Sequence, residues 1–356
     1  MRVIEMAMGI IAAVRGWQSI LEDNPSHARC RHRLPRRMLS RPLIVRTCNW
    51  VGETVLSIPA INLLSEHGYS PQLVGKRWTE SLLAGHSWPI AVRPGSLRDN
   101  IAQLCQLRRK ALLVDPTFDR RANTLLLTNS FSSALEARVA GLRALGYKRD
   151  GRSLLLDRSI ALPKAGHAML RYWTLACRFV GIDAPPPSTI NWRIAAVDQQ
   201  TADSLIALHS LGPRFVLICP FAATQYNKHD KTWPAFAEFA RAMLSAGHHL
   251  AACPGPGEAA QLRRDFPGVT LLADVGLGVY AGLFKRAALA VCNDTGPAHL
   301  AAAVGAPLLS MLGPTDPGLW APWGPTVSVL RRWPQWPTVG EALERSISLL
   351  IARNAT

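Results

Sequence analysis

The chain has 356 residues, of which 48% are hydrophobic and 18% charged, and its 40 Lys and Arg against 24 Asp and Glu give a formal net charge of +16. This length predicts about two domains. The composition predicts a large buried core, which excludes a disordered chain, a collagen and a small disulfide-stabilised protein. The excess of positive charge favours anionic partners: nucleic acid, lipid headgroups or phosphorylated small molecules.

The seven cysteines follow no metal-binding or disulfide spacing, and Cys219, Cys253 and Cys292 each end an apolar run, as buried thiols do. We therefore expect a reducing compartment, the cytoplasm. No apolar run reaches the ~18–20 residues of a membrane-spanning helix. The apolar run from Met6 to Val14 is short and has no clean cleavage site after it, so a signal peptide is not favoured.

Residues 1–40 form a basic N-terminal extension. Apolar residues recur at helical spacing from Ile10 to Leu21, which predicts a short amphipathic helix over residues 8–22, and six arginines follow between Arg29 and Arg41. Three interpretations remain open: a membrane-surface helix with a basic patch for anionic lipid, a disordered extension or mis-assigned start, and a nucleic-acid-binding arm. The last lacks interleaved aromatic residues and matches no nucleic-acid-binding motif.

From Arg41 onward, short apolar runs alternate with helical patterns. We expect a helix at about 54–67, a final helix at about 339–352, and strands at 43–46, 111–114, 124–128, 215–219, 249–253, 288–292 and 307–311. This alternation predicts βαβ units with parallel sheets, an α/β fold.

Three consecutive prolines make residues 183–189 the best linker, because proline is excluded from helix interiors and central strands. The linker separates residues 41–182 from residues 190–356. We expect two Rossmann-like domains facing a central cleft, with the terminal helix in the second, and no internal repeat is visible.

The most informative segment is Asn293-Asp-Thr-Gly-Pro-Ala-His, which follows a predicted strand and opens an Ala-rich helix. Free backbone N–H groups at such a helix start bind anions, and Gly296 allows a diphosphate to approach closely. Thr295 can add a hydroxyl, while Asp294 and His299 can project at the ligand. The alternative is an ordinary turn in which Asp294 caps the helix and His299 is packed.

A second segment, Pro220 to Pro234, lies between a predicted strand and a predicted helix. Thr224, Lys228 and Lys231 fall in this loop, where a lysine can neutralise a phosphate at a helix N-terminus. Taken alone, these lysines would be interpreted as solvated surface charges.

A third segment, Thr47-Cys-Asn-Trp-Val-Gly-Glu-Thr, is a strand-to-helix turn in the first domain. It places Glu53 near the carboxyl end of a strand, the edge at which open α/β sheets bind ligands. A carboxylate there suits a general base, although a lone acid at a helix start more often has a structural role.

Five motifs in order resemble glycosyltransferase family 9, the bacterial lipopolysaccharide heptosyltransferases, over roughly residues 41–330. Four of them are Asn49-Trp-Val-Gly-Glu, Lys231-Thr-Trp-Pro, Asp294-Thr-Gly-Pro-Ala-His and Gly313-Pro-Thr-Asp-Pro-Gly. The fifth, Thr128-Asn-Ser-Phe-Ser-Ser-Ala-Leu, resembles the heptosyltransferase II branch. The resemblance implies a GT-B fold in which the second domain holds ADP-heptose and the first faces the acceptor.

The resemblance also implies roles for individual residues. Glu53 and Asp294 would be catalytic, with Glu53 as the base. The donor would contact Thr224, Lys231, Glu258, Asp294, Thr295, Gly296 and His299, with Glu258 near the nucleoside, and the acceptor would contact Asn49, Trp50, Asn129 and Ser130.

The implied reaction is an inverting, direct displacement in which positive groups absorb the charge that grows on the diphosphate. The chain contains no Asp-x-Asp, so we expect no metal site of that kind and no cofactor. The implied acceptor is the anionic inner-core oligosaccharide of lipid A-linked lipopolysaccharide, not a nucleic acid. The implied location is the inner face of the inner membrane, as a peripheral cytoplasmic enzyme.

Two departures leave the donor and the turnover open. The family has Asp where this chain has Glu53, and a carboxylate displaced by ~1 Å can cost ~100-fold in rate. Ala223 stands where some members have a second hydroxyl. The alternatives are a non-catalytic or altered-donor relative that binds a nucleotide sugar or glycan, and a nicotinamide enzyme. The latter rests on Gly255-Pro-Gly-Glu-Ala-Ala, which contains a proline and lacks the expected downstream acid.

Overall fold

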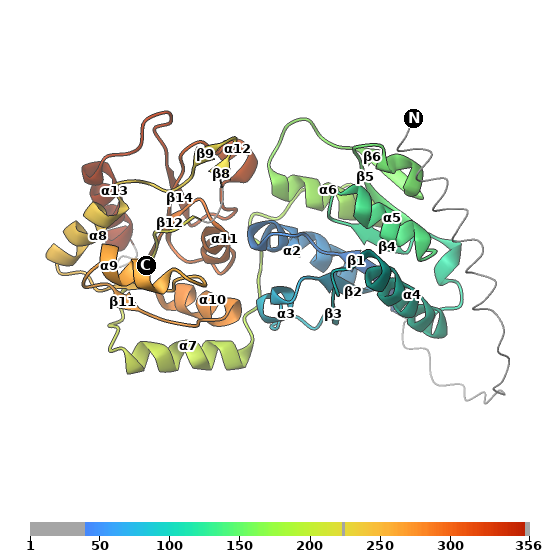
Figure 1. The fold of residues 1–356 in the computed structure, drawn as a ribbon, viewed down its shortest axis with the longest axis horizontal. Helices are drawn as coiled ribbons and strands as arrows, with labels where there is room; N and C mark the ends of the chain where they lie inside the picture. The colour runs from blue at the N-terminus through green and yellow to red at the C-terminus, as the bar shows by residue number, and fades with distance from the viewer. Residues whose placement is uncertain (1–39, 223–224, 353–356) are drawn as a thin grey trace.

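The computed structural model describes residues 40–222 and 225–352, and it contains two six-stranded sheets that are parallel throughout (Figure 1). The first has the order β3-β2-β1-β4-β5-β6, and the second has the order β11-β10-β7-β12-β13-β14. Both orders are the doubly wound arrangement, in which the chain builds one half of the sheet and then returns to build the other. The predicted α/β class with two Rossmann-like units is therefore confirmed.

The strands of the first sheet are β1 (Arg41–Arg46), β2 (Tyr69–Gly75), β3 (Ile90–Val92), β4 (Thr124–Leu126), β5 (Ala144–Lys148) and β6 (Arg158–Ala161). Those of the second are β7 (Val216–Cys219), β10 (Leu250–Ala252), β11 (Thr270–Leu271), β12 (Leu289–Asn293), β13 (Leu308–Met311) and β14 (Val327–Leu330). A separate hairpin joins β8 (Gln225–Tyr226) to β9 (His229–Asp230).

The helices of the first unit are α2 (Val51–Glu66), α3 (Trp78–Leu82), α4 (Leu97–Val114), α5 (Phe131–Val139) and α6 (Ala168–Val180), with 3-10 turns η1 (Phe118–Arg120) and η2 (Arg152–Leu155). Those of the second are α7 (Ala196–Leu208), α8 (Phe236–Ser245), α9 (Ala259–Asp265), α10 (Leu277–Arg286), α11 (Gly296–Ala303), α12 (Pro317–Trp320) and α13 (Val339–Ala352).

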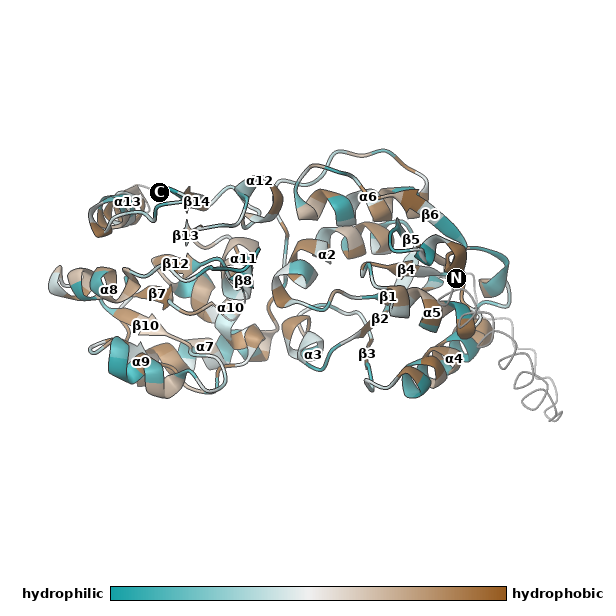
Figure 2. Cartoon of the chain, turned by 45° about the horizontal axis from the view of Figure 1, so that its top comes forward, coloured by the Kyte–Doolittle hydropathy of each residue, from teal (hydrophilic) through white to brown (hydrophobic). Residues whose placement is uncertain are grey.

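Each sheet is covered by helices on both faces, and its central strands are apolar on both sides (Figure 2). In β1, Leu43 and Val45 join the core under α2 and α6, whereas Ile44 joins the core under α4 and α5. In the second sheet, α10 and α11 cover one face, and α8 and α13 cover the other. The terminal helix α13 thus packs on the second unit, against α8.

One core runs from the first sheet to the second. Side chains of α2 and α11 belong to the same buried apolar cluster, and these two helices face each other between the sheets (Figure 1). The segment between the units is held by both of them. The indole N–H of Trp173 donates to the Ala184 carbonyl at 2.8 Å, and that of Trp323 donates to the Pro187 carbonyl at 2.9 Å.

Most predicted elements correspond to observed ones, with one clear error. Residues 111–114 are the last turn of α4, not a strand. The apolar Ala-Leu-Leu-Val run continues a long helix without any intervening turn residue, and so short a run does not distinguish the two structures. Strands β2, β3, β5, β6, β11 and β14 were not predicted. The expected helix over residues 8–22 lies outside the described residues.

None of the helices over residues 40–222 and 225–352 combines the length and the hydrophobicity that a membrane span needs.

Candidate active site

Several of the predicted site residues follow the strands at which the strand order reverses. In the first sheet, the carboxyl ends of β1 and β4 lead into Asn49 and Asn129; in the second, those of β7 and β12 lead into the loop after Cys219 and into Asp294. Doubly wound sheets bind ligands at this position, because loops leaving in opposite directions open a crevice there.

The centre of the second-sheet site is Asp294, which is almost fully buried. Its Oδ2 lies 3.3 Å from the ammonium nitrogen of Lys231 and accepts a hydrogen bond from the hydroxyl of Thr315. Lys231 is itself mostly buried. A buried carboxylate needs such partners, because burial without them is costly. The ion pair and the hydroxyl together fix the Lys231 ammonium beside the start of α11.

The position of Lys231 follows from its neighbours in the Lys-Thr-Trp-Pro motif. Trp233 is 1% exposed, and its indole N–H donates to the Pro337 carbonyl at 2.9 Å. The backbone N–H of Trp233 donates to Asn293 Oδ1 at 3.0 Å, and Asn293 Nδ2 donates to the Pro220 carbonyl at 2.6 Å. Asn293 therefore ties together the ends of β7 and β12 and the Lys231 loop, which explains the motif's tryptophan and the asparagine before Asp294.

The start of α11 has the features of an anion-binding helix start. Thr295 is the N-cap but makes no side-chain capping hydrogen bond, and Gly296 and Pro297 form the first turn. A helix start leaves backbone N–H groups without intrahelical partners, and the helix dipole adds positive potential there. Thr295, Gly296 and the Lys231 ammonium therefore offer hydrogen-bond donors and positive charge close together.

His299 connects the two sides of the site. A Cβ added to Gly52 of α2 would lie 2.5 Å from His299 Cδ2, and one added to Gly296 would lie 3.2 Å from Val51 Cβ. The starts of α2 and α11 thus touch, and glycine is required at residue 52 for this approach. Burial lowers the pKa of His299 to about 4, so the ring is neutral at physiological pH. Among the described atoms, its buried Nδ1 has no hydrogen-bond partner.

Glu53 lies in the first turn of α2, next to Gly52. Burial raises the pKa of its carboxyl group. A carboxylate made more basic in this way, at a helix start beside the opposite unit, has the properties of a general base. Glu53 thus belongs to the turn of α2 that lies nearest α11, and its role as a base stays a prediction.

The expected acceptor residues lie at the same edge of the first sheet. Trp50 is 60% exposed, and the Lys76 ammonium lies 5.6 Å from the centre of its ring. Ser130 caps α5, with its Oγ accepting from the Ser133 N–H at 3.3 Å. Asn129 Oδ1 is buried and has no partner among the described atoms.

The loop that carries Asn129 and Ser130 is held by the buried side chain of Arg152. The sequence analysis did not predict this role for Arg152. Arg152 is 0% exposed, and its Nη1 donates to the carbonyls of Thr128 at 2.7 Å and Ser130 at 3.2 Å. A Cβ at Gly146 would lie 2.4 Å from its Nη2, so Gly146 makes room for the guanidinium. Nothing in the sequence around Arg152 distinguishes it from the other arginines.

Two predicted donor residues, Glu258 and Thr224, are not placed beside Asp294 and Lys231 by any described contact. Glu258 follows β10 at the same sheet edge, and its Oε2 accepts from the Gly255 N–H at 2.7 Å, so one of its oxygens already has a structural partner. Thr224 lies outside the described residues. In the described chain, no group of three or more His, Cys, Asp and Glu side chains could hold a metal ion.

Two further residues, His167 and Thr315, make contacts in this region that the sequence analysis did not predict. His167 caps α6, and its Nε2 lies 2.7 Å from the Ala321 carbonyl of the other unit. Thr315 belongs to the Gly-Pro-Thr-Asp-Pro-Gly motif, but only the folded chain brings it to Asp294.

Comparisons with known proteins fit this geometry. A family model described as glycosyltransferase family 9 (heptosyltransferase) matches residues 116–343. Lipopolysaccharide heptosyltransferase 1 of Salmonella typhimurium is 30% identical over 175 residues, which are 47% of this chain and 51% of that protein. Lipopolysaccharide heptosyltransferase 3 of Escherichia coli is 31% identical over 121 residues, 32% of this chain and 35% of that protein. The chain thus spans about half or less of the length of these curated relatives.

Solved structures resemble the whole described fold. E. coli ADP-heptose lipopolysaccharide heptosyltransferase II aligns with a TM-score of 0.72 at 21% identity, over 88% of this chain and 99% of that one. E. coli heptosyltransferase WaaC with ADP aligns with a TM-score of 0.65 at 18% identity, over 86% and 99%. These likenesses establish the GT-B arrangement of the two units.

Proposed function

The chain belongs to glycosyltransferase family 9, and from that premise we propose that it transfers heptose from ADP-heptose to the inner-core oligosaccharide of lipid A-linked lipopolysaccharide, with inversion at the anomeric carbon. One observation carries this proposal: the start of α2, with Glu53, touches the start of α11, beside the Asp294–Lys231 pair. In this proposal Glu53 supplies the base on one side of that contact, and the Lys231 site holds the anionic donor on the other.

On the donor side, we assign the diphosphate to Lys231, Thr295 and the Gly296 backbone, and the nucleoside to the Glu258 turn. When the diphosphate binds, the Lys231 ammonium gains a second anionic partner while Asp294 and Thr315 keep it in place. Thr224 joins this group by its place in the sequence. His299, neutral and packed on Gly52, contributes a polar ring edge beside the sugar rather than a charge.

In the reaction, the Glu53 carboxylate takes the proton of the acceptor hydroxyl, and that oxygen forms a bond to the anomeric carbon. The bond from this carbon to the diphosphate oxygen breaks, and ADP leaves with the additional negative charge. Lys231 and the α11 start stabilise that charge as it develops. Asp294 acts by fixing the lysine and the turn.

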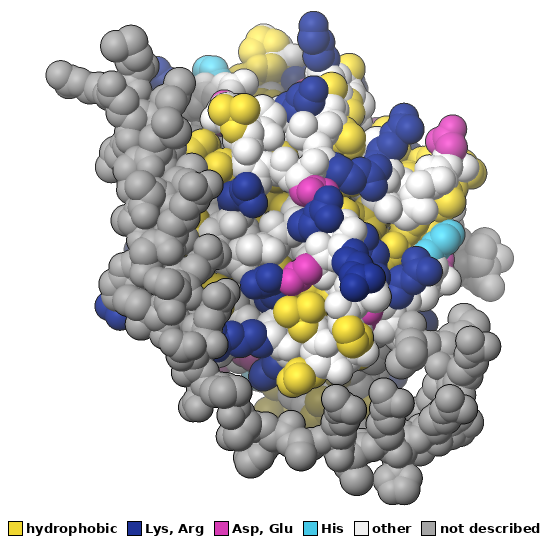
Figure 3. All heavy atoms as spheres, turned by 90° about the vertical axis from the view of Figure 1, so that its right-hand side faces the viewer, with side chains coloured by type: hydrophobic (Ala, Val, Ile, Leu, Met, Phe, Trp, Pro, Cys, Tyr) yellow, Lys and Arg dark blue, Asp and Glu magenta, His cyan; other side chains and the backbone are white. Residues whose placement is uncertain are grey.

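The distribution of charge supports an anionic acceptor on the first unit. Residues 40–182 carry 20 Lys and Arg against nine Asp and Glu, whereas residues 183–352 carry 12 of each. Lys and Arg side chains are spread over the outer end of the first unit, with few acids between them (Figure 3). Such a field attracts a phosphorylated glycolipid and the anionic surface that contains it. We propose a peripheral location at the inner face of the inner membrane on this basis.

Calorimetric titration of the protein with ADP-heptose, UDP-sugars and GDP-sugars tests the donor assignment. We expect selective ADP-heptose binding that Lys231→Ala weakens about 10- to 100-fold, the effect of losing one charge-assisted hydrogen bond. Lys285→Ala, which removes an exposed lysine at the end of α10, serves as the matched control and should leave the affinity unchanged.

Other outcomes distinguish the alternatives. Preference for another nucleotide would retain the fold and replace the heptose donor. Donor binding without turnover, with turnover gained in Glu53→Asp, would identify a non-catalytic relative in which the longer Glu53 side chain misplaces the base.

A further inference from the structure

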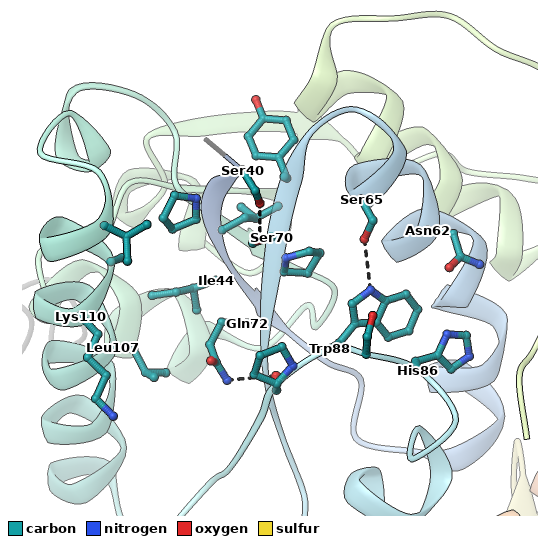
Figure 4. A pocket seen from close by; sticks show the side chains of 18 of the residues that line it. Ser40, Ile44, Asn62, Ser65, Ser70, Gln72, His86, Trp88, Leu107 and Lys110 are labelled. Atoms are coloured by element: carbon teal, nitrogen blue, oxygen red, sulfur yellow. Dashed lines mark hydrogen bonds between the residues drawn. The ribbon is translucent and has the colours of Figure 1, made fainter. Parts of the chain in front are cut away.

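A pocket of about 610 Å³ lies in the first unit, at the opposite ends of β1 and β2 from the candidate active site (Figure 4). Ile44, Leu107 and Trp88 give it an apolar lining, and Ser40 and Lys110 lie at its edges. The volume is in the range of sites that enclose a small ligand or several side chains. Nothing in the proposed transfer reaction uses this pocket.

Apolar surface continues from the pocket onto the end of α4. Val114 lines the pocket and is 58% exposed, and the adjacent Leu113 is 86% exposed. Single exposed apolar residues are common on protein surfaces. Leu113 and Val114 together, next to an apolar pocket, form a patch that is typical of a binding surface for another apolar segment.

The chain itself supplies a segment at this place. Ser40 lines the pocket, and its hydroxyl is hydrogen-bonded to that of Ser70 on β2, so residues 1–39 join the fold at the pocket's edge (Figure 4). Those residues contain the apolar helical pattern from Ile10 to Leu21. The 18 residues between Leu21 and Ser40 can span up to roughly 60 Å when extended, far more than the pocket requires.

The charges are complementary as well. Lys110 and Glu66 line the pocket and are exposed, and neither forms an ion pair with another described residue. The N-terminal segment carries Glu22 and Asp23 directly after its apolar pattern, and then the arginines from Arg29 onward. The segment therefore carries an acidic pair, opposite in charge to Lys110, and a basic run, opposite in charge to Glu66.

We propose that the pocket is the docking site of the chain's own N-terminal segment, with the apolar side chains of residues 8–22 covering Trp88, Val114 and Leu113. Because the segment is tethered at Ser40, its effective concentration at the pocket is on the order of millimolar, so modest contacts hold it. In this arrangement the apolar residues of the extension are buried against the first unit and are not free to act as a membrane anchor.

Disulfide trapping in the full-length chain tests the docking. Val14→Cys combined with Val114→Cys places one thiol on the segment and one at the pocket, and a disulfide requires Cα atoms within about 7 Å. The matched control combines Val14→Cys with Leu154→Cys, since Leu154 is also 86% exposed in the same unit but does not line the pocket. We expect the intramolecular disulfide, measured by peptide mass spectrometry, to form at least about tenfold faster in the first pair.

Hydrogen exchange provides a measurement that does not depend on new cysteines. Trp17→Asp should accelerate exchange of the amides near residues 86–89 and 107–114 about tenfold, and leave those of α5 unchanged. Equal trapping in the two pairs, or exchange unaffected by Trp17→Asp, would overturn the proposal. So would disulfides only between two molecules, which indicate a second copy, or protection only with phosphatidylglycerol vesicles, which indicates a membrane contact.

Discussion

The contact between α2 and α11 can be tested with one methyl group. In Gly52→Ala, the new Cβ would lie 2.5 Å from His299 Cδ2 and 3.1 Å from Nε2. Carbon atoms in ordinary contact are at least about 3.5 Å apart, so the ring or the helix must retreat by about 1 Å. His299 is buried in α11, and its ring cannot move aside freely. The substitution therefore separates Glu53 from the Asp294–Lys231 pair.

A displacement of about 1 Å between a base and the bound donor costs ~100-fold in rate. Overpacking of this kind also costs about 1–3 kcal/mol of stability. We expect Gly52→Ala to lower kcat about 100-fold in a coupled assay of ADP release, while ADP affinity changes little because Lys231 is untouched. A matched control is Gly276→Ala, where an added Cβ meets nothing within 4 Å.

Equal activity of Gly52→Ala and Gly276→Ala, with both folded by circular dichroism, would refute this reasoning. It would mean that the starts of α2 and α11 do not need to touch for turnover. Loss of activity together with loss of the fold would instead place Gly52 among the residues required for packing, and the ADP titration distinguishes this case.

Three further predictions follow from the same geometry. Because burial raises the pKa of Glu53, the acid-side fall of kcat/KM should occur at a higher pH than the titration of an exposed glutamate. Glu53→Gln should remove activity, and because it also removes a buried carboxylate, it should raise the stability measured by thermal unfolding at neutral pH. Burial lowers the pKa of His299 to about 4, so as the pH falls the unfolded chain binds a proton at this residue before the folded chain does, and stability should decline from about pH 6.5 toward pH 4. Denaturant titrations should find a smaller decline in His299→Gln, and a decline equal to that of the native protein would contradict the buried neutral ring. Arg152 donates to the carbonyls of Thr128 and Ser130 in the proposed acceptor loop, so Arg152→Met should raise the acceptor KM about tenfold and leave the ADP Kd unchanged. A change in the ADP Kd alone would contradict the role of Arg152 as a positioning residue.

The sequence was sufficient to locate the turns that form the candidate site. Glu53, Lys231 and Asp294 each stand in a short motif after a recognisable apolar strand, and strands of this kind bring their carboxyl ends to one edge. The fold class followed from the alternation of apolar runs and helical patterns. The two sheets share one strand order although no sequence repeat is visible, because the order depends on connection geometry rather than on residue identity.

What the sequence did not reveal depends on contacts between distant segments. Thr315 reaches Asp294 across 21 residues, Arg152 reaches Thr128 across 24, and His299 meets Gly52 from the other unit. No local pattern encodes such pairs. The error at residues 111–114 had a different cause: four apolar residues are compatible with a buried strand or with a helix end, and only the length of α4 decides between them.

The most direct test of the central claim is heptose transfer from ADP-heptose to a lipid A-linked inner-core acceptor, followed by mass spectrometry of the product, in native protein and in Glu53→Gln. We predict a heptosylated product with ADP release in the native protein, and at least a 100-fold slower reaction in the variant at unchanged ADP affinity. Transfer at the native rate by Glu53→Gln would contradict the assignment of the base, and no transfer by the native protein that binds ADP-heptose would contradict the proposed activity.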